Sequence, residues 1–278
     1  MFPRMLQDVK YAVVTGAASG MGRCYALQLA QRGYGVVLVD INGEAAQELS
    51  LQITRQYNLP APVICMDLTL PDAAERIASQ CKACGWRVEI LINNAGMLVA
   101  STVEKTEPER LCRIMALHCT TPLLLCRLLL PLMKEQGGGY ILNISSITAW
   151  MDWPLVGMYG CTKRFVKDYS RALRIECMGT PVSVTTAIFG AVDTPMSGDM
   201  PFMRHRKLLL RMGVMLSPER AARLALKAMF KRRATLIPCL SDRLVILLCP
   251  LLPNRLLHRL MKRFAHFFEP ARATELSR

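Results

Sequence analysis

Residues 11–31 read YAVVTGAASGMGRCYALQLAQ, and this stretch decides the fold class. The apolar run Tyr11–Thr15 predicts a buried strand, and the pattern after Gly22 predicts an amphipathic helix. Between them stands TGAASGMG, whose glycines allow a sharp turn and let backbone amides approach a pyrophosphate. Its spacing, GxxxGxG, differs from the GxGxxG fingerprint. The order of strand, glycine loop and helix predicts a phosphate-binding unit, and a tight turn without a ligand is the alternative.

The rest of the chain repeats the alternation of strand and helix. Short runs rich in Val, Ile and Leu predict six more strands, at Val36–Asp40, Val63–Asp67, Ile90–Asn93, Tyr140–Ser145, Val182–Ile188 and Thr235–Pro238. Amphipathic stretches separate them, which predicts a parallel sheet covered on both faces. We therefore expect an α/β, Rossmann-type doubly wound sheet of about seven strands. Thr106 and Glu109 predict a capping box, and Ser217 predicts an N-cap.

Positive charge gathers in the last quarter of the chain. Residues 1–203 hold 18 Lys and Arg against 17 Asp and Glu, whereas residues 204–278 hold 17 against 4. These parts carry +1 and +13, which sum to the net +14 of the 278-residue chain. We expect one dinucleotide-binding and catalytic domain at 1–239, with a substrate lid near 193–216, and a basic amphipathic extension at 240–278.

The basic extension leaves three interpretations open. It lies on an anionic membrane surface, covers the substrate entrance, or packs against another subunit. It has no recognised nucleic-acid-binding module, so we expect no nucleic-acid partner. The chain has no run of 18 apolar residues, and its first residues lack the core of a signal peptide, so we expect no membrane span and no leader.

Cysteine usage bears on the compartment. Eleven cysteines without a disulfide-like spacing favour a reducing, cytoplasmic location. The single CxxC, Cys81 and Cys84, has no second pair and no histidine cluster beside it, so we expect no metal. His205, His258 and His266 are expected to be surface side chains.

Polar residues end several predicted strands, where ligands bind in open α/β sheets. Asp40 ends the second strand, and a carboxylate there accepts hydrogen bonds from ribose hydroxyls and repels a 2′-phosphate. No arginine follows it, so NAD(H) is favoured over NADP(H); a helix-capping role for Asp40 is compatible with this. Asp67 ends the third strand, and Asn93-Asn94-Ala95-Gly96 ends the fourth.

Tyr159 and Lys163, in MYGCTK at 158–163, lie one helical turn apart. A surface pair is the alternative to a proton-transfer site. Bringing the pKa of tyrosine from about 10 to 7 or 8 takes roughly 3–4 kcal/mol. A nearby ammonium and the positive ring of an oxidised nicotinamide act in that direction. Ser146 precedes Tyr159 by 13 residues and ends a strand, so its hydroxyl can face the same substrate oxygen.

Together these motifs resemble the short-chain dehydrogenase/reductase family over about residues 8–238. The segment 141–176 is most similar to the hydroxysteroid dehydrogenase and 3-oxoacyl reductase branch. The resemblance implies hydride transfer between a nicotinamide and a hydrophobic secondary alcohol or ketone, in lipid metabolism. It implies that Tyr159 exchanges the proton, that Ser146 polarises the substrate oxygen, and that Lys163 holds the ribose and acidifies the tyrosine.

The resemblance also implies the cofactor site. Val192 and Thr194 match positions that bind the nicotinamide carboxamide, after Phe189-Gly190, where the family usually has Pro-Gly. The expected cofactor-binding residues are Gly16, Ser19, Gly20, Met21, Gly22, Asp40, Asp67, Leu68, Asn94, Ala95, Gly96, Tyr159, Lys163, Val192 and Thr194.

His118 departs from the family pattern, which usually has an asparagine that kinks the helix and holds a water in a proton relay with the lysine. We count it with Ser146, Tyr159 and Lys163 as a catalytic candidate. Three interpretations are open. In the first, His118 takes over the relay, since imidazole donates and accepts near neutral pH. In the second, it fills the kink while the relay runs through other waters, and in the third it signals a lost or redirected activity.

Two further expectations concern the surroundings of the site. A segment containing Met196, Met200, Met203, Met212 and Met215 suits a mobile lid over an apolar substrate, and a packed loop is the alternative. The apolar helix around Leu123–Met133 suits the interface of a homo-oligomer. A cofactor-binding sensor or scaffold with little turnover is the alternative function, motivated by His118 and the basic extension.

Overall fold

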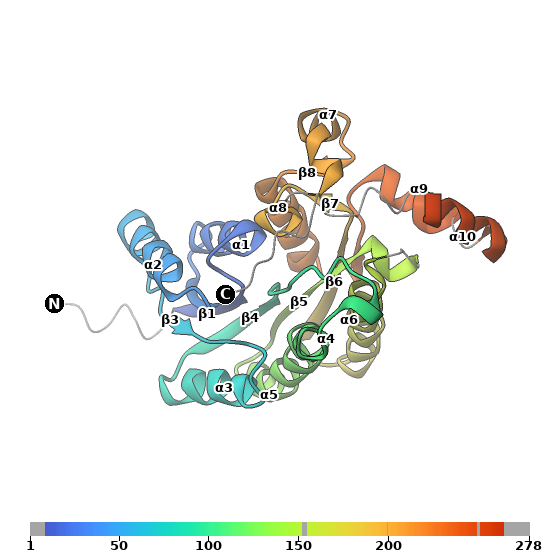
Figure 1. Cartoon of the computed structure of the whole chain (residues 1–278). Coiled ribbons are helices and arrows are strands. Elements are labelled where there is room, and N and C mark those ends of the chain that lie inside the picture. Colours follow the sequence, from blue (N-terminus) through green and yellow to red (C-terminus); the bar gives the residue numbers. More distant parts are fainter. Residues whose placement is uncertain (1–8, 152–154, 199, 249–250, 264–278) are drawn as a thin grey trace.

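The computed structural model describes residues 9–151, 155–198, 200–248 and 251–263. One parallel sheet has the strand order β3-β2-β1-β4-β5-β6-β9, which confirms the doubly wound fold (Figure 1). β3 and β9 lie at its edges and are shorter than predicted, since each pairs on one side only. The strands are β1 (Lys10–Thr15), β2 (Gly35–Asp40), β3 (Val63–Cys65), β4 (Arg87–Asn93), β5 (Gly139–Ser146), β6 (Val182–Phe189) and β9 (Thr235–Leu236).

Helices cover both faces of the sheet (Figure 1). One face carries α1 (Gly20–Ala30), α2 (Gly43–Tyr57) and α8 (Pro218–Phe230), and the other carries α3 (Ala73–Ala83), α5 (Thr121–Glu135) and α6 (Gly157–Glu176). In β1, Ala12 and Val14 belong to the first core and Tyr11 and Val13 to the second. Both faces are buried, which explains why the strands are continuous apolar runs.

The helix α4 (Pro108–Met115) runs through a π-helical turn at Ala116–Thr120 into α5. The combined helix Pro108–Glu135 is long and apolar enough, by length and composition, to cross a membrane. One face of α5 is nevertheless packed in the core, where Leu125 and Leu129 are fully buried. The role of this helix in an oligomer stays a prediction.

Of the two predicted helix caps, one is wrong and one is confirmed. The capping box at Thr106 is wrong: its hydroxyl donates to the Thr102 carbonyl at 2.8 Å, and Glu107 occupies the N-cap of α4. A short 3₁₀ turn at Val103–Lys105 brings Thr102 within reach of Thr106. Ser217 is the N-cap of α8, as predicted, and accepts from the Arg220 amide.

Beyond β6 the chain leaves the sheet and returns. β7 (Ala191–Val192) and β8 (Met215–Leu216) pair as a parallel ribbon, and α7 (Arg206–Arg211) lies between them. This excursion is the predicted lid segment, and Arg206 ties it back to Asp193 at 2.6 Å. The extension forms α9 (Leu240–Leu248) and α10 (Asn254–Arg263). His266 and the remainder of the extension fall outside the described residues, as do the first eight residues.

Candidate active site

Two adjoining cavities open at the carboxyl ends of the strands, the usual ligand position in doubly wound sheets. One, of about 360 Å³, runs past the glycine loop and Asp40, and we call it the cofactor cavity. The other, of about 470 Å³, contains Tyr159, and we call it the substrate cavity. The two cavities share the residues Met21, Asn94, Thr194 and Met196. A dinucleotide lying in the first would therefore present one end to the second.

The glycine loop has the conformation that its sequence predicts. Gly16 and Gly20 have φ values of 63° and 50°, which favour glycine. A Cβ on Gly22 would collide with the Gly16 carbonyl. Asn94 secures the loop from β4, since its Nδ2 donates to the carbonyls of Thr15 and Gly16 at 3.0 and 3.2 Å. The loop is thus held open for an anion next to the N-terminus of α1.

The far end of the cofactor cavity carries two carboxylates. Asp40 Oδ2 accepts from the Ala18 amide at 2.8 Å and Oδ1 accepts from the Asn42 amide at 2.9 Å, so Asp40 supports the loop as well as lining the cavity. Burial raises the pKa of Asp67, but hydrogen bonds from Thr69 and the nearby Arg113 outweigh it, so that pKa lies below its usual value. The wall of the cofactor cavity thus includes the carboxylates of Asp40 and Asp67.

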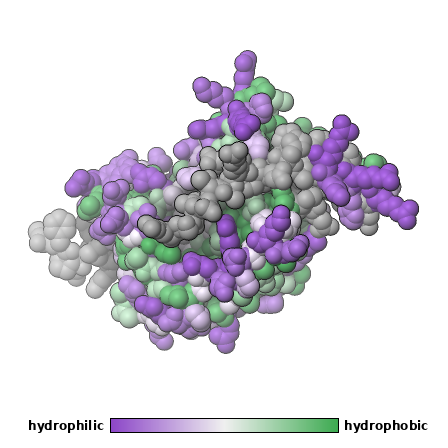
Figure 2. Space-filling view, in the orientation of Figure 1, coloured by the Kyte–Doolittle hydropathy of each residue, from purple (hydrophilic) through white to green (hydrophobic). Residues whose placement is uncertain are grey.

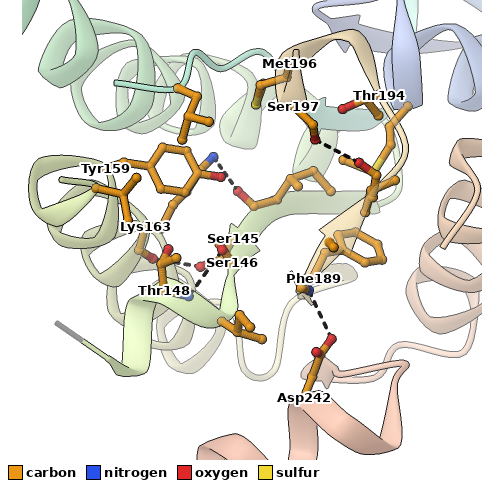
Figure 3. Close-up of a pocket in the computed structure, with 18 of the residues that line it drawn as sticks. Ser145, Ser146, Thr148, Tyr159, Lys163, Phe189, Thr194, Met196, Ser197 and Asp242 are labelled. Atoms are coloured by element: carbon orange, nitrogen blue, oxygen red, sulfur yellow. Dashed lines mark hydrogen bonds between the residues drawn. The ribbon is translucent and has the colours of Figure 1, made fainter. Parts of the chain in front are cut away.

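Three of the four catalytic candidates, Ser146, Tyr159 and Lys163, meet in the substrate cavity (Figure 3). Ser146 ends β5, and its hydroxyl accepts from the Thr148 amide at 3.2 Å and hydrogen-bonds to Tyr159. Lys163 Nζ donates to the Ile144 carbonyl at 3.1 Å and lies 5.6 Å from the centre of the Tyr159 ring. The predicted helix, α6, therefore places Tyr159 and Lys163 beside the end of β5.

The expected acidification of Tyr159 depends on an oxidised nicotinamide as well as on Lys163, and the groups of the protein alone do not produce it. Burial raises the pKa of Tyr159 to about 12, although the hydrogen bond from Ser146 acts in the opposite direction. Burial also lowers the pKa of Lys163 to about 8. Burial is therefore the main influence on the Tyr159 phenol, and the groups of the protein alone keep it neutral near pH 7.

His118 lies behind Tyr159, in the π-helical turn, and is buried. Its Nε2 accepts from the Met97 amide at 3.0 Å, and its Nδ1 lies 2.8 Å from the Thr162 hydroxyl. That hydroxyl donates to the Tyr159 carbonyl, so Nδ1–H is the donor to Thr162. Burial and then the charge of Lys163 hold the pKa of His118 well below its ordinary value.

This arrangement bears on the three interpretations of His118. A neutral imidazole offers one donor and one acceptor, and both are already in use. The geometry favours a histidine that fills the kink and joins two helices over one that carries a proton relay. Gly96 makes room for it, since a Cβ at that position would lie 2.9 Å from Nε2.

The substrate cavity contains a carboxylate that the sequence did not indicate. Asp242, in the first turn of α9, is 4% exposed and lines the cavity across from Tyr159 (Figure 3). Its Oδ2 accepts from the Gly190 amide at 3.0 Å, and burial raises its pKa despite this bond. A carboxylate in a segment with only four acidic residues was the available signal. The C-terminal extension therefore contributes a residue to the wall of the substrate cavity.

Most predicted site residues line one cavity or both. The cofactor cavity holds Gly16, Ser19, Gly20, Asp40, Asp67, Leu68, Ala95 and Gly96; the substrate cavity holds Ser146, Tyr159, Lys163 and Val192; Met21, Asn94 and Thr194 line both. Gly22 and His118 do not line either cavity. Gly22 packs against the Gly16 carbonyl, and His118 contacts Thr162. Among the described residues, no group of three or more His, Cys, Asp or Glu could hold a metal ion.

Comparison with known proteins agrees with this geometry. The family model described as short chain dehydrogenase matches residues 10–203, and the chain belongs to the short-chain dehydrogenase family. It is 33% identical over 190 residues to human 17-beta-hydroxysteroid dehydrogenase type 3, covering 68% of this chain and 61% of that protein. It is 33% identical over 183 residues to rat very-long-chain 3-oxoacyl-CoA reductase, covering 64% and 58%. The chain thus covers about three fifths of the length of each of these two relatives.

Solved structures share the fold. A 7beta-hydroxysteroid dehydrogenase structure has a TM-score of 0.80 at 22% identity, covering 91% of this chain and 96% of that one. A Sphingobium yanoikuyae short-chain dehydrogenase with NADPH has a TM-score of 0.75 at 25% identity, covering 91% and 96%. A Brucella melitensis 3-ketoacyl-(acyl-carrier-protein) reductase with NADH has a TM-score of 0.70 at 29% identity, covering 79% and 90%. Structural neighbours therefore include complexes with either cofactor.

Proposed function

We propose that this protein is an NAD(H)-dependent oxidoreductase that moves a hydride between the nicotinamide and a hydrophobic secondary alcohol or ketone, of steroid-like or long-chain 3-oxoacyl type. One observation carries the proposal: the hydroxyl-bearing pair Ser146 and Tyr159 lies in a cavity of about 470 Å³ whose other walls are largely apolar, and which adjoins the glycine-loop cavity. Those apolar walls include Leu98, Val156, Phe189, Phe202 and Leu209.

Two features support the finer choices. Asp40 at the end of β2 favours unphosphorylated ribose, because a 2′-phosphate would face a carboxylate. The names of the relatives, a 17-beta-hydroxysteroid dehydrogenase and a very-long-chain 3-oxoacyl-CoA reductase, support large apolar substrates. The alternative of a cofactor sensor is not favoured, since three of the four catalytic candidates, Ser146, Tyr159 and Lys163, line one cavity.

The residues divide the chemistry between them. Tyr159 in its neutral form donates a proton to the ketone oxygen during reduction, and its phenolate accepts the proton from the alcohol during oxidation. Ser146 donates a hydrogen bond to the same oxygen, where negative charge develops in the transition state. Lys163 supplies the nearby cation. The nicotinamide, when bound, gives up the hydride in reduction and takes it in oxidation.

A neutral Tyr159 phenol suits the reaction in the direction of ketone reduction. Because burial raises the pKa of Tyr159 to about 12, the proton-donating form is present throughout the neutral range. Reduction of a ketone therefore requires no prior ionisation of the residue.

A substrate screen tests the proposal. Purified protein is incubated with steroid ketones, 3-oxoacyl thioesters and the matching alcohols, with NAD(H) and NADP(H) in parallel, and the nicotinamide absorbance is followed. We expect turnover with at least one apolar substrate and a preference for NAD(H). Tight cofactor binding without turnover on any substrate would instead support the sensor.

A further inference from the structure

A row of exposed leucines runs along α9 and just beyond it. Leu240, Leu244, Leu247 and Leu248 occupy one side of the helix, at spacings of four, three and one residues. These leucines and Leu251 form what we call the leucine stripe, with exposed fractions of 70%, 47%, 66%, 53% and 74%. Exposed apolar residues in a contiguous row mark an interaction surface, whereas single ones do not.

The stripe faces away from the protein because the opposite side of α9 is fixed. Asp242 is buried there and accepts from the Gly190 amide at 3.0 Å. With that side held in the substrate cavity, the leucines are not covering the cavity. One interpretation of the extension was that it covers the substrate entrance. Asp242 does line the substrate cavity, but the leucine stripe does not.

Cations border the stripe. Arg243 is exposed on α9, and α10 exposes Arg255, Arg259 and Lys262 together with Leu256, which is 45% exposed. Figure 2 shows hydrophilic side chains projecting over α10 at one end of the molecule. The part of the chain from residue 204 carries 17 Lys and Arg against 4 Asp and Glu. The surface thus combines an apolar row with a strong positive charge.

A second patch of the same kind lies across the substrate cavity. Leu208 and Met212 of α7 and its C-cap are 55% and 65% exposed, one turn apart, among the exposed Arg204, Lys207 and Arg211. Leu209 from this helix and Asp242 from α9 line the same cavity. Two basic and apolar elements therefore flank the substrate cavity.

We propose that α7, α9 and α10 form a docking surface for an anionic lipid bilayer, with the leucine stripe inserted at the level of the headgroups. Amphipathic helices with leucine on one face and Lys or Arg on the other bind such surfaces. α9 has 9 residues and α10 has 10, short of the roughly 20 that span a bilayer, so they lie on the membrane.

Charge distinguishes this occupant from a second copy of the chain. A symmetric dimer through the stripe would bring two segments of net +13 together, and they would repel. An anionic headgroup layer neutralises the same charge. Elsewhere on the helices that the structure describes, Leu51 on α2 is exposed singly, and Ile175 and Met178 at the end of α6 form only a pair.

Vesicle co-sedimentation with the full chain tests the proposal independently of any substrate. We expect binding to phosphatidylcholine vesicles that contain phosphatidylglycerol, little binding to pure phosphatidylcholine, and a loss of binding as salt rises. The double variant Leu244→Glu/Leu247→Glu should weaken binding at least tenfold. The matched variant Leu51→Glu/Ile175→Glu, on α2 and α6, should not.

A charge variant keeps the test decisive if the leucine variant fails to fold. Arg255→Glu/Arg259→Glu should also weaken binding at least tenfold, whereas Arg55→Glu on α2 should not, with unfolding temperatures confirming folded protein. Absent binding to anionic vesicles, or equal binding by the stripe and control variants, would overturn the proposal. So would a dimer, seen by light scattering, that dissociates in Leu244→Glu/Leu247→Glu.

Discussion

The imidazole Nδ1 of His118 lies 2.8 Å from the hydroxyl of Thr162, one residue before Lys163. This contact joins the π-helical turn to α6, the helix that carries Tyr159. The same imidazole accepts from the amide of Met97, the residue after the Asn93–Gly96 motif. Because Thr162 donates in turn to the Tyr159 carbonyl, the position of the catalytic helix depends on a neutral histidine. The predictions below test this contact and the other parts of the site.

Acid should weaken the fold through His118. Burial and Lys163 lower its folded pKa below the ordinary 6.5, so the unfolded chain binds the extra proton first. The stabilisation is fully present above about pH 6.5 and is lost as the pH falls from there towards the folded pKa. The slope reaches at most about 1.4 kcal/mol per pH unit for one proton. Urea unfolding of the wild type and of His118→Asn between pH 7.5 and pH 5 measures this pH dependence of the unfolding free energy. Only the wild type has the imidazole that takes up the proton on unfolding. Parallel curves for the two proteins would contradict the assignment.

Removing the Tyr159 hydroxyl should strongly reduce turnover and spare cofactor binding. We expect Tyr159→Phe to lower kcat by about 10²–10⁴, the usual contribution of general acid–base catalysis. NADH affinity, measured by fluorescence titration, should change by less than about threefold, equivalent to 0.7 kcal/mol. Tyr57→Phe, at the end of α2, is the matched control. Turnover of Tyr159→Phe at the wild-type rate would disprove the mechanism.

Asp40 should set the cofactor preference. We expect the wild type to bind NADH at least about tenfold more tightly than NADPH, a difference of 1.4 kcal/mol. Asp40→Asn removes the charge and keeps one of the two oxygens that accept from backbone amides, so the preference for NADH over NADPH should narrow. Asp72→Asn, at the start of α3, should leave it unchanged. Tighter binding of NADPH by the wild type would sink the assignment.

Asp242 should hold the loop that follows β6. Asp242→Ala leaves the partly buried Gly190 amide without its acceptor, which should destabilise the fold by about 1–3 kcal/mol. Asp242→Asn retains an acceptor and should recover most of that loss. Because Val192 and Thr194 follow Gly190 by two and four residues, the Ala variant should also raise KM for the cofactor. Urea unfolding and steady-state kinetics on the three proteins check both effects, and equal behaviour of Ala and Asn would argue against the hydrogen bond.

Gly22 should tolerate no side chain. Its Cβ would overlap the Gly16 carbonyl, so Gly22→Ala requires a shift of the backbone, and overpacking of this kind typically destabilises by about 1–3 kcal/mol. Gly157→Ala is the control, since a Cβ there meets open space, and we expect a change within about 1 kcal/mol. Unfolding midpoints measure both. A Gly22→Ala protein as stable as the control would refute the close packing of the loop.

Local pattern was sufficient for the fold and for most of the cofactor site. The strands at Tyr11–Thr15 and Val182–Ile188 are apolar runs, because both faces of a parallel sheet are buried. Parallel strands end at one edge, so Asp40, Asn94 and Ser146 had to come together once the strands were assigned. The spacing of Tyr159 and Lys163 on a helix likewise depends only on helical periodicity.

The sequence by itself therefore determined the doubly wound sheet, the glycine loop and the placing of Ser146, Tyr159 and Lys163 on one wall. Only the tertiary structure decided their protonation and the partners of His118 and Asp242. Ionisation depends on desolvation and on charges that approach from distant segments, as Gly190 approaches Asp242 across 52 residues and His118 approaches Thr162 across 44. Such contacts exist only after the chain has packed, which is why burial, and not the nearby lysine, governs the pKa of Tyr159.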